Sequence, residues 1–212
     1  MRILALSDVH CNWDRFPVDQ MPDADCCVVA GDLTDWGKRR QWSEYLSSVC
    51  FMEGLAEKYT VVFWIPGNHE LDVTPFEYDV ANRVIGLYGK LAWHGKVFQG
   101  VSCSPCYDMP GLAEQWDYMT ADPAKEKAVY ESLEACDVLV SHCPPHGHLD
   151  NAGYVIGEGE VHIGSRELAA YIERHKPKLV ICGHVHGQGG KESWIGETRI
   201  VNVARTWKLL EV

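Results

Sequence analysis

Five short apolar runs, each followed at once by a polar cluster, constrain the fold of this chain more than any other feature. The runs are residues 2–7, 26–30, 60–65, 137–141 and 178–182. Apart from polar or charged residues at some of their ends, they are β-branched or apolar, as in strands buried on both faces. Helical patterns lie between them, over residues 37–58, 75–86, 123–135 and 165–175. Because strands that alternate with helices are typical of α/β proteins, the chain is predicted to have an α/β fold.

Two regions interrupt this alternation. Residues 90–103 are expected to form strands joined at Gly95 or Gly100, and residues 192–203 are expected to form a hairpin that turns at Gly196. Two sheets, or one sheet with antiparallel additions, would accommodate both. Since the sequence contains no repeat, linker or low-complexity segment, residues 1–212 are predicted to form one domain.

Composition excludes several classes of protein. Of the 212 residues, 46% are hydrophobic, which is enough for a sizeable core. The net charge of -11 argues against broad binding to nucleic acid, which needs basic patches. No apolar stretch approaches the roughly 20 residues of a membrane span, and the N-terminus does not resemble a signal peptide. We therefore expect a soluble cytoplasmic protein that does not bind membranes.

The nine cysteines are odd in number and several lie inside apolar runs. This favours reduced thiols over a disulfide framework. Cys103 and Cys106 have the spacing of a redox motif, but no helical pattern begins at Cys106. A loop with two incidental thiols is the favoured interpretation, and a redox protein is kept as an alternative.

The polar clusters contain the side chains that divalent metals prefer, which are carboxylate, imidazole and amide oxygen. Each cluster follows the carboxyl end of an expected strand, and loops at such ends converge in open α/β sheets. Two metals about 3.5–4 Å apart are a known device for attacking phosphate esters. Seven candidate ligands result: Asp8, His10, Asp32, Asn68, His142, His184 and His186.

The stretch from residue 143 to residue 164 is polar and rich in glycine. A loop of this length inside a compact domain is usually functional. Because it directly follows His142, it is expected to overhang the site, and its His146 and His148 are candidate contacts for a substrate. Asn12, two residues after His10, is a third candidate.

The order D-x-H, G-D, G-N-H-[DE], H and G-H-x-H, from Asp8 to His186, resembles the calcineurin-like metallophosphoesterase superfamily. Residues 141–145 with residues 148–150 further resemble a branch of small single-domain phosphoesterases and phosphodiesterases. The resemblance implies a four-layer α/β/β/α sandwich of two mixed sheets flanked by helices. It also implies a division of the ligands between two metals bridged by Asp32. The first metal would be held by Asp8, His10 and His186, and the second by Asn68, His142 and His184.

The same resemblance gives roles to the neighbours of the ligands. His69 would contact the scissile phosphate and assist the leaving oxygen, as a protonated imidazole physically can. Asp35 would orient His69, although it is equally expected as a helix cap. Trp36 stands where protein phosphatases of the superfamily carry a phosphate-binding arginine. This departure disfavours a phosphoprotein substrate.

The predicted reaction is in-line hydrolysis of a small phosphoester by a metal-bridging hydroxide. Manganese is the expected metal, and iron, zinc, nickel or cobalt would suit the same ligands. Phosphodiesters, including cyclic nucleotides, are favoured because no dense basic cluster lies near the motifs. A phosphomonoesterase, including a protein phosphatase, and a non-catalytic scaffold remain alternatives. Trp13 and Trp116 are candidates to line a pocket, whereas His94, His162 and His175 are expected to have no function. The oligomeric state stays open.

Overall fold

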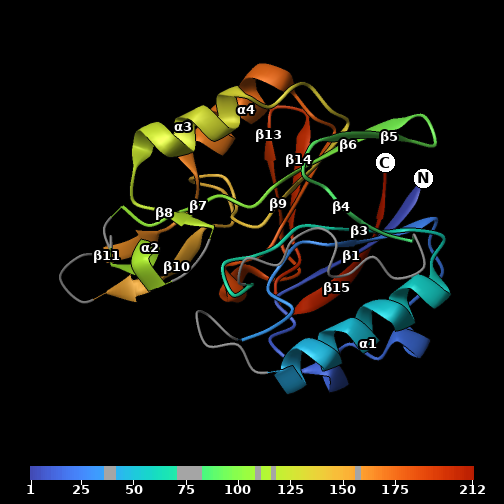
Figure 1. The fold of residues 1–212 in the computed structure, drawn as a ribbon. Helices are drawn as coiled ribbons and strands as arrows, with labels where there is room; N and C mark the ends of the chain where they lie inside the picture. The colour runs from blue at the N-terminus through green and yellow to red at the C-terminus, as the bar shows by residue number, and fades with distance from the viewer. Residues whose placement is uncertain (36–41, 71–82, 108–110, 116–117, 156–158) are drawn as a thin grey trace.

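The computed structural model describes residues 1–35, 42–70, 83–107, 111–115, 118–155 and 159–212, and two large sheets form its centre (Figure 1). The first sheet has the strand order β15-β1-β2-β3-β4. Its strands are β1 (Arg2–Ser7), β2 (Cys26–Val29), β3 (Val62–Trp64), β4 (Val84–Gly86) and β15 (Thr206–Glu211). Strands β1 to β4 run parallel, and β15 pairs antiparallel with β1.

The second sheet has the order β13-β14-β12-β9-β6-β5. Its strands are β5 (Lys90–Trp93), β6 (Lys96–Val101), β9 (Val138–Ser141), β12 (Leu179–Cys182), β13 (Glu192–Ile195) and β14 (Thr198–Asn202). The inner pairs are parallel, and the hairpins β5–β6 and β13–β14 add antiparallel edges. Both sheets are therefore mixed.

Three apolar cores stack through the molecule and explain why the strand sequences are apolar on both faces. Along β1, Ile3 and Ala5 point into a core between the two sheets, while Leu4 and Leu6 point into an outer core. The outer core lies against helix α1 (Trp42–Lys58). On the other side, the second sheet packs against α3 (Pro123–Glu131) and α4 (Arg166–His175). Figure 1 shows these helices on the two outer faces, which confirms the four-layer α/β/β/α sandwich.

Several local signals act as expected. The Ser165 hydroxyl accepts a hydrogen bond from Leu168 N at 2.8 Å and caps α4. Helix α4 ends at His175, and the following Lys176 caps it with a left-handed φ of 51° immediately before Pro177. The hairpins turn at Gly95 and Gly196, both with positive φ.

Two expectations about elements were wrong, and one strand was missed. Residues 84–86 form strand β4 rather than the end of a helix, and residues 75–82 lie outside the described residues. The stretch 143–164 is not a continuous loop, because β10 (Asn151–Val155) and β11 (Gly159–His162) form an antiparallel hairpin within it. Strand β15 was not anticipated. Within the described residues of the helix expected over 37–58, the structure has α1.

Short elements complete the described chain. They are η1 (Trp13–Arg15), η2 (Val18–Gln20), β7 (Ser104–Pro105), α2 (Leu112–Gln115), β8 (Met119–Thr120) and η3 (His186–Gln188). Of the helices described, none has the length and apolar character needed to cross a lipid bilayer.

Candidate metal centre

The five polar clusters converge at the carboxyl ends of β1, β2, β3, β9 and β12. The first three strands belong to one sheet and the last two belong to the other. Contacts between the clusters cross from sheet to sheet: His142 Nε2 lies 3.0 Å from Asn68 Oδ1 and 3.2 Å from Asp32 Oδ2. The centre therefore spans the edges of both sheets, as expected for strand ends of this topology.

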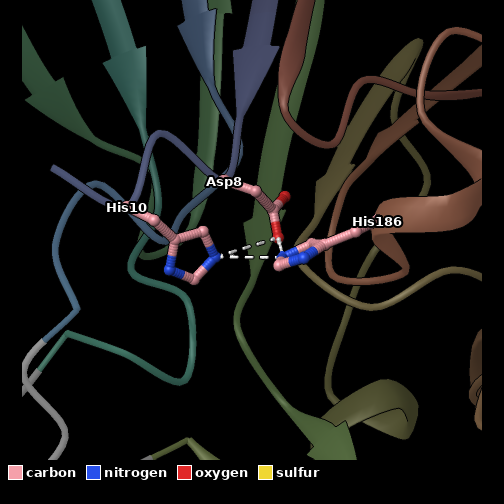
Figure 2. Close-up of side chains that lie close together, drawn as sticks. All are labelled: Asp8, His10 and His186. Carbon is pink, nitrogen blue, oxygen red and sulfur yellow. Dashed lines mark hydrogen bonds and ion pairs between the residues drawn. The ribbon is translucent and has the colours of Figure 1, made fainter. Parts of the chain in front are cut away.

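One group of side chains comprises Asp8, His10 and His186 (Figure 2). His186 Nε2 lies 3.1 Å from Asp8 Oδ1 and 3.0 Å from His10 Nε2. His10 Nε2 is also 3.7 Å from Asp8 Oδ1. The three side chains point toward one another from two loops, one with Asp8 and His10 and the other with His186, that are far apart in sequence.

A second group comprises Asp32, His142 and His184, whose potential ligand atoms all lie within 4.8 Å of one another. His142 is fully buried, and its Nδ1 donates a hydrogen bond to Ala30 O at 2.8 Å. A carbonyl only accepts, so Nδ1 carries the proton and Nε2 faces the oxygens of Asp32 and Asn68. His10 is oriented in the same way, because its Nδ1 donates to Asp35 Oδ1 at 2.6 Å.

The backbone at the centre is strained. Asp8, His10, Asp32 and His184 have left-handed φ angles of 56°, 48°, 54° and 67°. A left-handed φ at a residue other than glycine raises the conformational free energy by about 1–2 kcal/mol. The turns are held by hydrogen bonds between strand ends, such as Asp8 N to Gly31 O at 3.0 Å and His10 N to Asp32 O at 3.1 Å. Strain of this kind persists only where the surroundings enforce it, and it clusters at functional sites.

Gly31 and Gly67 permit the close approach of these loops. A Cβ on Gly31 would lie 2.5 Å from Gly67 N and 2.7 Å from His142 Nδ1. A Cβ on Gly67 would collide with Asp32 Oδ1. These two glycines are therefore needed because the loops pack too closely for a side chain, and not because the chain must be flexible there.

Glu70 is a structural residue for which sequence reasoning gave no role. It is 1% exposed and accepts four backbone hydrogen bonds, from Gly67 N at 2.6 Å, Asp32 N at 2.7 Å, Leu33 N at 2.6 Å and Thr34 N at 3.2 Å. Burial and the charge of Asp32 raise its pKa to about 7, although the hydrogen bonds oppose this. Glu70 thereby joins the loops after β2 and β3. The acidic residue directly after Asn68-His69 was its only sequence signal.

Asn202, at the end of β14, was also missed. It is fully buried, and its Nδ2 donates to Gly183 O at 3.0 Å and Val185 O at 3.4 Å, while its Oδ1 accepts from Ala204 N at 2.8 Å. It therefore positions the loop that carries His184 and His186. A single asparagine at the end of an apolar strand offered no distinctive signal.

The electrostatics of the centre favour added positive charge. Burial lowers the pKa of His142, but the charges of Asp32 and Asp8 outweigh burial and raise it to about 10. The pKa of His10 is raised to about 9 in the same way. Burial and the neighbouring His142 lower the pKa of His184 to about 4, so this imidazole stays neutral and keeps a lone pair for a ligand.

Comparison with known proteins agrees with this geometry. The family model described as calcineurin-like phosphoesterase matches residues 1–188. The chain belongs to the calcineurin-like phosphoesterase family. It is 29% identical to the UPF0046 protein K07C11.7 of Caenorhabditis elegans, over 97% of this chain and 70% of that protein. It is 24% identical to metallophosphoesterase domain-containing protein 1 of Homo sapiens, over 96% of this chain and 65% of that protein.

A solved structure, that of TT1561 of Thermus thermophilus, has the same fold. The TM-score is 0.61 at 20% identity, and the match covers 98% of this chain and 97% of the other. Membership of the family supports metal-dependent hydrolysis of phosphoesters in general, and the two groups of side chains described above offer places for metal ions.

Asp35 has a different partner from the one expected of a family member. Its Oδ1 hydrogen bonds to His10 Nδ1 at 2.6 Å and lies 3.8 Å from His69 Nδ1. Burial lowers the pKa of His69, and the charge of Asp32 only partly offsets this. The lowered pKa favours the neutral imidazole form of His69, whereas the sequence had suggested the protonated form. Trp36, the other neighbour in this motif, lies outside the described residues.

Of the three candidate substrate contacts outside the metal centre, one lines a cavity beside the centre and two do not. His146 lines a cavity beside the centre, together with His69 and His184. His148 instead hydrogen bonds through Nδ1 to Ser193 Oγ at 2.8 Å, away from the residues that line this cavity. Asn12 is exposed ahead of η1 and is also absent from the lining described.

The aromatic and thiol candidates behave as packing residues. Trp13 packs against Phe51 in the outer core, and Trp116 lies outside the described residues. Cys103 and Cys106 flank β7 as free thiols, and no helix begins at Cys106. Burial and nearby Glu126 raise the pKa of Cys103 to about 12, and burial raises that of Cys106. Neutral buried thiols argue against the redox alternative.

Proposed function

We propose that this protein is a phosphodiesterase that hydrolyses small phosphoesters with two divalent metal ions, manganese in particular, held at the centre described above. The observation that carries the proposal is the convergence of ligand lone pairs. His142 Nε2 faces two oxygens at 3.0 and 3.2 Å, and His10 Nε2 faces His186 Nε2 at 3.0 Å. Acceptor atoms this close repel one another unless a proton or a cation lies between them.

The donor set fits metal ions well. Imidazole, carboxylate and one amide oxygen suit borderline divalent metals such as manganese. Asp8, His10 and His186 would hold one ion, Asn68, His142 and His184 would hold the other, and Asp32 would bridge them. Asp32 supports this assignment by its position, since its Oδ2 lies 3.6 Å from His10 Nε2 and 3.2 Å from His142 Nε2, one imidazole in each set.

When bound, the two cations would neutralise charge on the phosphate and supply a nucleophile from water at neutral pH. The side chains of the protein hold this arrangement in place. Asp8 accepts from Ser7 Oγ at 2.5 Å and from His184 N at 3.0 Å, so its carboxylate is fixed before any ligand binds. We assign His69 as the catalytic residue that donates a hydrogen bond to the leaving oxygen, and Asp35 as a residue that positions His10.

The cavity beside the centre supports a diester substrate. It has a volume of about 310 Å³ and extends from His69 and His184. It therefore offers room for a second ester arm, a nucleoside included. All nine cysteines lie among the described residues as free thiols, which supports a reducing, cytoplasmic location. Residues 1–212 are proposed to form one domain.

A panel of phosphomonoesters and phosphodiesters, including bis-aryl and cyclic nucleotide substrates, tests the proposal. Each substrate is assayed with Mn²⁺ and with EDTA, using the wild-type protein and Asp32→Ala. We expect hydrolysis of diesters that EDTA and Asp32→Ala both abolish. Hydrolysis of monoesters alone would replace the diesterase by a monoesterase. Activity on none of the substrates would favour a non-catalytic scaffold.

A further inference from the structure

The cavity beside the centre has two unlike sides. Asn68, His69 and His184 form the side that belongs to the centre. Seven other lining residues, called here the wall, are Leu112, Met119, Val161, Ile163, His146, His162 and Arg166. The volume of about 310 Å³ lies at the lower end of the range for small-molecule sites. One cavity thus connects the proposed reaction centre to His146, a candidate substrate contact from the sequence, and to further residues for which sequence and family gave no role.

The apolar part of the wall comes from three different elements. Leu112 lies on α2, Met119 on β8 and Val161 on β11. All three side chains are partly exposed. An apolar lining open to solvent is stabilised when a ligand with an apolar body covers it.

The polar part of the wall is built around a buried carboxylate. Asp150 is 1% exposed, and its Oδ1 accepts from His162 Nδ1 at 2.8 Å, while its Oδ2 lies 3.4 Å from His146 Nδ1. Gly147 N and Gly164 N donate to the same carboxylate at 2.9 and 3.2 Å. The imidazole rings of His146 and His162 are 5.9 Å apart, edge to face. Asp150 thereby fixes both rings, and the Nε2 atom of each lies away from it.

The charge of the wall contrasts with that of the whole chain. The protein carries a net charge of -11, yet Arg166 lines the cavity and forms no ion pair with any residue in the described ranges. The hydrogen bond from His162 to Asp150 raises the pKa of His162 and favours its charged form. Glu160 lies 3.6 Å from His162 Nε2, but its side chain is 66% exposed, so water weakens its competition.

We propose that the wall binds the part of the substrate beyond the scissile phosphate, and that this part is an apolar body bearing an anionic group that contacts Arg166 and His162. The inference rests on the proposed function for the identity of the scissile group. It defines the substrate class more narrowly, as a phosphodiester with a second negative charge on one arm, either a carboxylate or a phosphate.

Direct binding tests the wall without any turnover. The purified protein is titrated by calorimetry with 2-naphthoate and with 2-naphthamide, which have the same ring system but differ in charge. We expect naphthoate to bind about tenfold more tightly, as one or two charge-assisted hydrogen bonds provide. Equal binding of both probes, or binding of neither, would overturn the proposal.

Three variants identify the residues responsible. Arg166→Gln and His162→Gln should reduce the preference for naphthoate to within about twofold. Arg174→Gln is the matched control, because Arg174 lies on the same helix but outside the cavity lining. It should keep the full preference. If naphthoate bound through the metals instead, Arg166→Gln and His162→Gln would retain the preference, and the wall would have no role.

Kinetics then connects the wall to catalysis. Two p-nitrophenyl phosphodiesters are compared whose second arm is a phenyl ring with a 4-carboxylate or a 4-carboxamide. For the carboxylate ester, we expect Arg166→Gln to raise KM about tenfold and to change kcat by less than about twofold. For the carboxamide ester, we expect both KM and kcat to change by less than about twofold. Equal effects on both esters would contradict the proposal. If the wild-type protein hydrolyses neither, the proposed function fails, whereas the binding experiment still decides the role of the wall.

Discussion

The centre and the wall line one cavity but are built differently. In the centre, Asp8 and His142 are 1% and 0% exposed, and strained strand ends hold the ligands. In the wall, the side chains of His146 and His162 are 38% and 37% exposed and belong to a segment that contains a hairpin. A buried site held by many contacts preserves one chemistry, whereas partly exposed side chains on and beside a separate two-stranded hairpin can change with the substrate. We therefore expect the centre to set the reaction class and the wall to set the choice of substrate.

The largest expected effect is in the centre. His142→Ala removes an imidazole that contacts both Asp32 and Asn68. We expect hydrolysis to fall by at least about a thousandfold, which corresponds to about 4 kcal/mol of transition-state stabilisation. Metal content, measured on the purified protein, should fall with it. His175→Ala, at a partly exposed histidine that ends α4, is the control. Full activity of His142→Ala would contradict the division between centre and wall.

His69 lies where the centre meets the cavity, and its replacement should produce the next largest effect. His69→Gln keeps the backbone hydrogen bond from His69 N to Asp32 Oδ1, at 2.8 Å, so the loop should be preserved. We expect kcat to fall about a hundredfold with metal content unchanged. The loss should be larger for a phenol leaving group than for p-nitrophenol, because the poorer leaving group needs more assistance. An equal loss with both would indicate that His69 acts on binding and not on departure.

Glu70 tests whether the centre is rigid because its loops are fastened together. Each carboxylate oxygen accepts two backbone N–H groups, so the amide nitrogen in Glu70→Gln would face two donors. We expect a loss of about 2–4 kcal/mol in the free energy of unfolding and a Tm lower by roughly 5–15 °C. Thermal unfolding is compared with that of Glu131→Gln, a side chain that is 58% exposed on α3. Equal Tm values would show that the loops hold without this carboxylate.

The sequence predicts that the candidate ligands meet, because the information that places them is local. Each ligand stands directly after an apolar run, and parallel strands bring their carboxyl ends to one edge. The spacing of Asp8 and His10, or of His184 and His186, is set within a single turn. Backbone geometry therefore determines most of their placement, and the order of the motifs gives the rest.

The features of the fold and site that the sequence did not predict depend on contacts between distant segments, which no local pattern encodes. Glu70 and Asn202 act by joining loops. The motif marks the position of Glu70 but not this role, and nothing in the neighbours of Asn202 distinguishes it from a surface residue. Strand β15 adds to the sheet only through its pairing with β1, and β4 is too short for periodicity to separate it from a helix. The pair of His162 with Asp150 spans 12 positions and the β10–β11 hairpin, so sequence reasoning gave His162 no function.

The smallest expected effect concerns the thiols near the cavity. Cys106 lines the cavity, and Cys103 has a pKa of about 12, so only about one molecule in 10⁴ carries the Cys103 thiolate at pH 8. We expect iodoacetamide to label exposed Cys50 first, as mass spectrometry of tryptic peptides would show, and to label Cys103 faster only as the pH rises toward 12. Cys106→Ser should change kcat/KM by less than about twofold, because serine retains the size of the side chain and the wall binds through Arg166 and His162. A loss of activity that follows labelling of Cys103 or Cys106 at pH 8 would instead give the thiols a role in turnover, and the wall would then contribute to the reaction as well as to the choice of substrate.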